Sequence, residues 1–233
     1  MMATKQMISA LVKSRQSIRA FTNQAISQHE LQEMLQLASR SPSGTNIQPW
    51  KVYVVQGNKK IEIQNAVKQA VIAVSENPEQ KGWYEAAFQY YPKQWFEPYL
   101  SRRRANGWGL YNLLDIQKHE KQKMQAHLLR NFEFFGAPVG IFFTAHENLH
   151  ASAKMAIAMF MQTFMLVAKG YGFDSCPQAA WNDYHKVILP LLGAEPDEQL
   201  ICGMALGYAD PQHIINEYYT PRIPVQDFAV FLD

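Results

Sequence analysis

The sequence predicts an α+β fold, because helical segments outnumber strands and do not alternate with them regularly. Three segments rich in β-branched and aromatic residues have the composition of strands: 50–55, 139–144 and 200–207. Apolar residues recur at helical spacing over 4–14, 59–75, 151–169 and 183–192, and a more polar helix is predicted over 117–134. A doubly wound α/β fold would require a regular strand–helix alternation, which this order does not provide.

Local signals mark the ends of two of the predicted helices. Ser27 and Glu30 form a capping-box pattern, so a helix is expected to begin there and to end before Pro42. The most apolar helix, 151–169, is followed by Gly170 and Gly172, which are C-cap candidates. The apolar stretch within it, 156–168, is too short to span a bilayer and contains Gln162, so we expect this helix to be buried in a core or a subunit interface.

Composition excludes several classes of function. Lys and Arg exceed Asp and Glu by only two charges, which does not indicate a nucleic-acid partner. The start of the chain has no apolar stretch long enough for a signal peptide. Cys176 and Cys202 are the only cysteines and form no Cys-x-x-Cys motif, which favours a reduced, cytoplasmic protein without a membrane partner.

The segment His146-Glu147-Asn148-Leu149-His150 matches the H-E-x-x-H motif of zinc proteases. That motif needs both histidines on one face of a helix, with the glutamate beside them to activate water. Here it begins two residues after a predicted strand, and no third ligand is evident. A solvated connection is favoured, no metal is expected, and a zinc hydrolase is kept as the less favoured alternative.

Arginines occur in three short segments that are candidates for binding an anion. Arg15, Ser17 and Arg19 alternate as in an extended chain, which places all three on one side and could form an anion-binding edge or an exposed polar strand. Arg222 lies between two prolines in Thr220-Pro221-Arg222-Ile223-Pro224. The Arg102–Arg104 run is interpreted as a solvated helix face, with a phosphate or NADPH contact as the alternative.

Six segments in the same order resemble the nitroreductase family of FMN-dependent, NAD(P)H-using flavoenzymes. They are RQSIRAF, SPSGTNIQPWKVYVV, the apolar helix 151–169, YGFDSCPQAAW, ICGMALGYADP and TPRIPVQDF. The tract YYPKQWFEPYLSRRRANGWGLYNLL further resembles the branch that acts on nitrobenzoates and other nitroaromatics.

The resemblance implies one FMN-binding domain over 1–233, with a central, mostly antiparallel sheet flanked by helices, in an intertwined homodimer with two FMN sites at the interface. It implies ping-pong transfer of two electrons from NADH or NADPH to a nitroaromatic or quinone. A non-catalytic flavin-binding or regulatory protein is the other alternative.

The resemblance also assigns the residues of the FMN site. It implies that Arg15 and Ser17 grip the phosphate and ribityl chain, that Gln16 lies close by and that Arg222 completes the phosphate site. Arg19 is placed at the N1/O2 edge of the ring, where a fixed cation supports the negative charge of the reduced flavin.

Two more segments receive a role from the resemblance. The loop that contains Pro42, Ser43 and Asn46 is expected to reach across the dimer to the partner's flavin. Pro177 and Gln178 are expected beside the flavin N5 and dimethylbenzene side, mainly through their backbone, and Cys176 is expected to be a packed residue rather than a nucleophile.

An aromatic-rich segment, 83–111, contains ten of the chain's 29 aromatic residues. Two interpretations remain open: a subunit interface where two chains wrap around each other, or a flap over the flavin that selects flat substrates by stacking.

Overall fold

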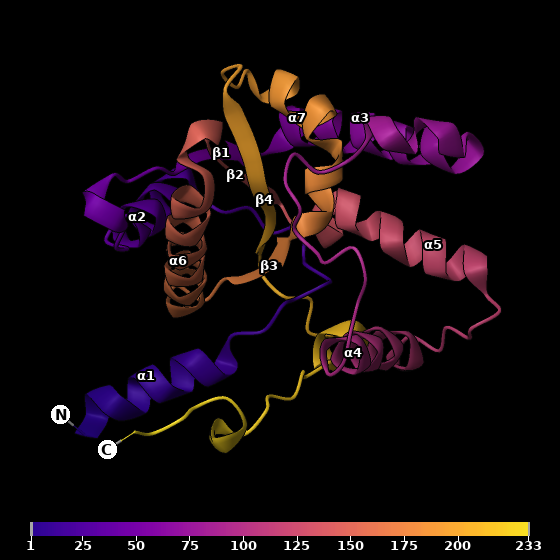
Figure 1. The fold of residues 1–233 in the computed structure, drawn as a ribbon. Helices are drawn as coiled ribbons and strands as arrows, with labels where there is room; N and C mark the ends of the chain where they lie inside the picture. The colour runs from indigo at the N-terminus through magenta and orange to yellow at the C-terminus, as the bar shows by residue number, and fades with distance from the viewer. Residues whose placement is uncertain (1, 233) are drawn as a thin grey trace.

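A four-stranded antiparallel sheet lies at the centre of the protein, and the computed structural model describes residues 2–232 around it (Figure 1). The strands are β1 (Lys51–Val55), β2 (Val139–His146), β3 (Asp174–Gln178) and β4 (Glu198–Gly207). They lie in the order β1-β2-β4-β3, and each neighbouring pair is antiparallel. The predicted central antiparallel sheet is therefore confirmed.

Helices flank this sheet, as the α+β prediction requires. They are α1 (Met2–Ser14), α2 (Gln28–Ala38), α3 (Gly57–Glu76), α4 (Tyr99–Leu113), α5 (Lys121–Leu129), α6 (His150–Gly170) and α7 (His185–Leu192). The capping box at the start of α2 is present, because the Ser27 side chain accepts from the Glu30 N–H and the Glu30 carboxylate accepts from the Ser27 N–H.

Two hydrophobic cores cover the two faces of the sheet. Side chains alternate along β2, so Ile141 and Phe143 pack into the core under α2 and α6, while Phe142 packs into the core under α3 and α7. Trp181 is fully buried in the second core, stacked on Phe134 with 4.5 Å between the ring centroids. The sheet is thus buried on both faces.

Helix α6 is long and apolar enough to cross a membrane, together with the turn before it (Glu147–Gly170). Its inner face, however, includes Ile157, Phe160 and Phe164, which are buried in the core shared with α2 and the sheet. We therefore interpret α6 as a core helix, as its sequence predicted. Met155 and Met159 lie on its exposed side, with 67% and 38% of their surfaces accessible.

Two elements were missed by the sequence patterns. Strand β3 contains Pro177, which cannot donate to a ladder, but β3 is an edge strand whose only strand partner in the described chain is β4. Helix α4 begins inside the aromatic segment 83–111, and its aromatic and arginine side chains show no apolar stripe that would have revealed it. The predicted helix 117–134 is shorter than expected: α5 ends at Leu129, and the chain continues as a 3-10 helix over Arg130–Gly136 in which Phe134 and Phe135 adopt left-handed conformations.

Helix α1 and the tail after Tyr218 extend away from the sheet, and the two chain ends lie near each other in Figure 1. Both segments carry apolar side chains on their surface. Met7 is 72% exposed on α1, and Phe231 and Leu232 are 84% and 89% exposed in the tail.

Candidate functional site

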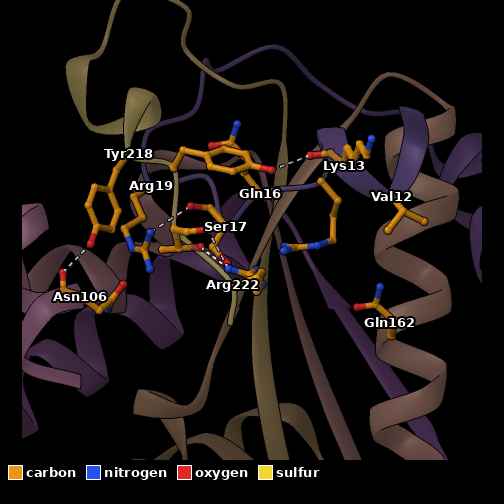
Figure 2. A pocket seen from close by; sticks show the side chains of 12 residues that line it. Val12, Lys13, Gln16, Ser17, Arg19, Asn106, Gln162, Tyr218 and Arg222 are labelled. Atoms are coloured by element: carbon orange, nitrogen blue, oxygen red, sulfur yellow. Dashed lines mark hydrogen bonds between the residues drawn. The ribbon is translucent and has the colours of Figure 1, made fainter. Parts of the chain in front are cut away.

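A pocket of about 550 Å³ lies beside the end of α1 (Figure 2). Side chains from four separate parts of the chain surround it, namely the end of α1 with the segment that follows it, Asn106 of α4, Gln162 of α6 and the tail 218–222. Lys13, Arg15, Arg19 and Arg222 all line this pocket, together with neutral polar side chains. The pocket is therefore strongly positive.

The segment after α1 is held rigidly against the sheet. Ile18 donates its N–H to the Ser175 carbonyl at 3.1 Å, in an isolated parallel bridge beside β3. The Asn216 side chain fixes the same segment from the other side. Its Oδ1 accepts from the N–H groups of Arg19 and Ala20 at 3.0 and 3.2 Å, and its Nδ2 donates to the Ala20 carbonyl at 2.8 Å. These bonds fix the backbone from which Ser17 and Arg19 enter the pocket.

Two of the pocket's cations repel each other. Burial lowers the pKa of the Arg15 guanidinium, and the nearby positive charge of Arg222 lowers it further. Within residues 2–232, no carboxylate lies within ion-pair distance of either guanidinium. Like charges held together without a counter-ion are stabilised when an anion binds between them.

Arg19 and Arg222 are each held by carbonyl groups close by in the chain. Arg19 donates from Nη1 to the Ser17 carbonyl at 3.0 Å. Arg222 donates from the same atom type to the carbonyl groups of Thr220 and Pro221 and to the Thr220 hydroxyl. These bonds use one nitrogen of each guanidinium group. The other N–H donors of Arg19 and Arg222 remain available for a phosphate or a carboxylate.

The pocket contains five of the residues singled out in the sequence: Arg15, Gln16, Ser17, Arg19 and Arg222. It does not contain Pro42, Ser43 or Asn46, whose loop is largely exposed elsewhere on the surface. A hydrogen bond from the buried Ser41 hydroxyl to Thr163 of α6, at 2.8 Å, fixes the base of that loop.

The loop 42–48 has an unusual backbone. Thr45, Asn46 and Gln48 have φ values of 48°, 59° and 48°, in a region that non-glycine residues rarely occupy. The Ser43 hydroxyl accepts from the Gln48 N–H at 3.0 Å, which closes the turn. Strained backbone of this kind persists where a function requires it, and here it presents polar groups to the outside of the chain.

Pro177 and Gln178 are neighbours in the sequence but lie in different surroundings. Pro177 lines a second, more apolar cavity, which also includes Gln162. The Gln178 side chain is buried, donates to the Asn131 carbonyl at 2.7 Å and accepts from the Trp181 indole N–H. Gln178 can therefore contribute only backbone groups to a ligand.

Both thiols are buried, and burial raises the pKa of Cys176 to about 11 and that of Cys202 to about 12. A thiol with such a pKa is protonated at neutral pH and is a poor nucleophile. Cys176 and Cys202 are thus packed residues.

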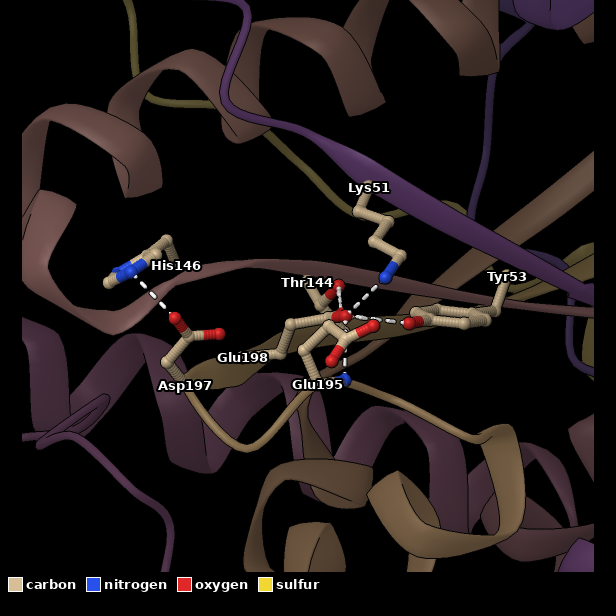
Figure 3. Close-up of polar contacts among 7 residues, drawn as sticks. All are labelled: Lys51, Tyr53, Thr144, His146, Glu195, Asp197 and Glu198. Carbon is tan, nitrogen blue, oxygen red and sulfur yellow. Dashed lines mark hydrogen bonds and ion pairs between the residues drawn. The ribbon is translucent and has the colours of Figure 1, made fainter.

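The H-E-x-x-H segment does not form the helical arrangement of a zinc protease, and Figure 3 shows its His146 paired with Asp197. His146 ends β2, and both its ring nitrogens are engaged: Nε2 pairs with Asp197 Oδ2 at 2.7 Å, and Nδ1 accepts from the Asn148 N–H. His150 begins α6, so the two histidines do not share a helical face. In residues 2–232, no three metal-binding side chains are clustered. The geometry gives no support to a zinc hydrolase.

Several pocket residues were not predicted. In the sequence, Gln162 is distinguished only as a polar residue within an apolar helix. This polar position in the apolar stretch is the signal that could have placed it in a site. Asn106 and Tyr218 carried no pattern, because they reach the pocket only through the packing of α4 against the tail, where the Tyr218 hydroxyl donates to the Asn106 carbonyl. The Arg102–Arg104 run does not line the pocket; Arg102 and Arg103 lie over the rings of Tyr99 and Trp95.

Comparison with known proteins identifies the family. The model of the nitroreductase family matches residues 12–208. A 4-nitrobenzoate reductase of Nocardioides sp. (strain LMS-CY) is 32% identical, over 96% of this chain and 89% of the relative. A nitrobenzene nitroreductase of Ectopseudomonas oleovorans is 30% identical, over 99% of both chains.

Solved structures agree with the sequence relatives. The FMN and NADPH-dependent nitroreductase NfnB of Sphigopyxis sp. strain HMH superimposes with a TM-score of 0.91 at 30% identity, covering 97% of this chain and 98% of that one. The FMN-dependent nitroreductase NfnB of Mycobacterium smegmatis, solved in complex with NADPH, gives 0.89 at 27% identity, over 99% and 100% of the two chains. With a family match over most of its length and a shared fold, this chain belongs to the nitroreductase family.

Proposed function

We propose that this protein is an FMN-dependent oxidoreductase that passes two electrons from NADPH or NADH to nitroaromatic or quinone acceptors. The observation that carries this proposal is a pair of cations, the partly buried Arg15 and the more exposed Arg222, that face one pocket without a carboxylate. The names of the relatives support the choice of FMN, NADPH and nitroaromatics among the possible anions and substrates.

The pocket residues fit FMN chemically. A phosphate dianion would relieve the repulsion between Arg15 and Arg222, and the Ser17 hydroxyl would add a hydrogen bond to it. Gln16 lines the same pocket and supplies amide groups for the ribityl hydroxyls. The cavity of about 550 Å³ gives room for the phosphate and the sugar chain.

Arg19 has a different role from Arg15 and Arg222, which would bind the phosphate. When bound, FMN supplies the two-electron transfer between nicotinamide and acceptor. Arg19 holds a fixed positive charge, oriented by its bond to the Ser17 carbonyl and by the Asn216 clamp on its backbone. At the N1/O2 edge of a bound flavin, this charge would stabilise negative charge on the ring and so favour its reduction by NAD(P)H.

A homodimer would complete the site. The exposed apolar residues of α1, of the tail and of the outer side of α6 support an extensive, intertwined subunit contact. The strained loop with Pro42, Ser43 and Asn46 lies outside its own chain's pocket and presents polar groups at the surface, so we place it against the partner's FMN. We propose that residues 1–233 act as one domain in each subunit, in the cytoplasm, where the buried thiols remain reduced.

The identity of the bound group tests the proposal. We expect the protein to purify yellow and to release, on denaturation, stoichiometric FMN that chromatography separates from FAD. Equimolar FAD, or bound zinc with no flavin, would refute it.

A further inference from the structure

A second cavity, of about 440 Å³, lies between α6, β4 and the segment around Phe88. Its walls are mainly apolar and aromatic, with contributions from Phe88, Tyr90, Met161, Met165, Ile201 and Cys202. Flexible methionines beside aromatic rings form surfaces that bind flat aromatic molecules well. The cavity therefore has the shape and the chemistry of a site for an aromatic ring.

One charged side chain, Lys154, lines this cavity in the described part of the chain. Its ammonium lies 4.7 Å from the centre of the Phe88 ring and donates to the His150 carbonyl at 3.3 Å. Among residues 2–232, no carboxylate forms an ion pair with it. A cation without a counter-ion on an apolar wall is suited to a ligand that carries an anionic group on an aromatic body.

The cavity adjoins the proposed FMN pocket. Gln162 lines both, and Pro177, expected beside the reactive side of the flavin, lines the apolar cavity. Lys154 and Gln162 are eight residues apart on α6, which separates their backbone positions by about 12 Å. An aromatic acid whose carboxylate pairs with Lys154 would therefore direct the opposite end of its ring toward Gln162 and the flavin.

We propose that this cavity binds the ring of the electron acceptor and that Lys154 selects nitroaromatics with a carboxylate para to the nitro group. The inference rests on the proposed function, which it narrows to nitrobenzoate-type acceptors. Lys154 acts as a specificity-determining residue: it binds the carboxylate, and the electron transfer occurs at the other end of the molecule.

Lys154→Met tests the role of the charge, because methionine keeps an unbranched apolar side chain and removes the ammonium. On the FMN-loaded enzyme, kcat/KM for 4-nitrobenzoate should fall roughly ten- to hundredfold, the range for a lost charge-assisted bond. The kcat/KM for nitrobenzene should stay within about twofold, and Lys154→Arg should restore most of the activity on 4-nitrobenzoate.

Lys186→Met provides a matched control. Lys186 also lies over an aromatic ring, 4.1 Å from the centre of Trp83, but does not line the cavity. Its removal should leave both substrates unaffected. Equal losses on nitrobenzene and 4-nitrobenzoate in Lys154→Met would contradict selection of the carboxylate.

Two measurements on the unmodified holoprotein need no variant. Calorimetry should show that benzoate, which cannot be reduced, binds more tightly than benzyl alcohol, with an affinity that falls as salt is added. Turnover of 4-nitrobenzoate should exceed that of 2-nitrobenzoate.

If nitroaromatics are reduced but benzoate does not bind, as when partner residues fill the cavity, this inference fails and the proposed function stands. If FMN is present but no nitroaromatic is reduced, the proposed function itself fails.

Discussion

Mixing two variants that cannot bind FMN should restore FMN to about a quarter of all sites. The first variant, Arg15→Ala with Arg222→Ala, removes the phosphate grip. The second, Ser43→Leu with Asn46→Leu, removes the polar groups of the strained loop. Each homodimer carries its defect in both sites. In a heterodimer, one site collects both defects and the other is assembled from intact parts, and random pairing gives dimers in a ratio of roughly 1:2:1.

The experiment consists of unfolding and refolding the mixture with FMN and measuring bound flavin. Each variant refolded alone is the control, and native mass spectrometry counts the heterodimers. Recovery requires that the loop of one chain serve the pocket of the other. If heterodimers form in the expected proportion and no FMN is recovered, the loop does not act across the subunits.

Glu198→Gln should lower the melting temperature by about 5 to 10 °C at pH 7, the equivalent of roughly 2 to 3 kcal/mol. The Glu198 side chain, only 6% exposed, accepts hydrogen bonds from Lys51, Tyr53 and Thr144, and from the Glu195 N–H (Figure 3). One carboxylate thus ties β1, β2 and the start of β4 together, and an amide cannot accept at both positions.

The contribution of Glu198 to the stability of the fold should depend on pH. Hydrogen bonds from Lys51, Thr144, Glu195 and Tyr53 outweigh the opposing effect of burial and lower the pKa of Glu198 from 4.5 to about 2. Because the pKa in the folded state is lowered, the stabilisation is complete above about pH 4.5 and is lost as the pH falls toward 2. The difference in melting temperature between wild type and variant should close over that interval, with both proteins at equal concentration.

Glu62→Gln is the matched control. Glu62 pairs with Lys59 at 2.7 Å on the surface of α3, where both side chains are half exposed, and such pairs contribute little. A shift as large as that of Glu198→Gln would show that any lost carboxylate destabilises the protein, and the assignment of Glu198 as a link between strands would be wrong.

Local signals in the sequence predicted most elements, because caps and apolar periodicity act over a few residues. The capping box at Ser27, the strand after Trp50 and the apolar face of α6 could all be recognised in this way. Strand β3 could not, since its hydrogen bonds to β4 overcome the unfavourable Pro177. Helix α4 escaped recognition because its side chains show no apolar stripe.

The site was predictable only in part, for a related reason. Arg15, Ser17 and Arg19 could be recognised together because two-residue spacing in an extended segment places them on one side. Asn216 binds that segment from almost 200 positions away, and its contribution depends on how the tail folds back. Lys154 carries no pattern on α6 that distinguishes it from a solvated lysine, and only the cavity around it suggests a role.

The most direct test of the account is an anaerobic visible spectrum of the purified protein during one catalytic cycle. NADPH or NADH should bleach the absorption of the oxidised flavin, and 4-nitrobenzoate added afterwards should restore it. A non-catalytic flavin-binding protein would stay yellow through both additions, and a zinc hydrolase would be colourless at the start. Absorption that neither nicotinamide changes would contradict the assignment as a nitroreductase that uses FMN.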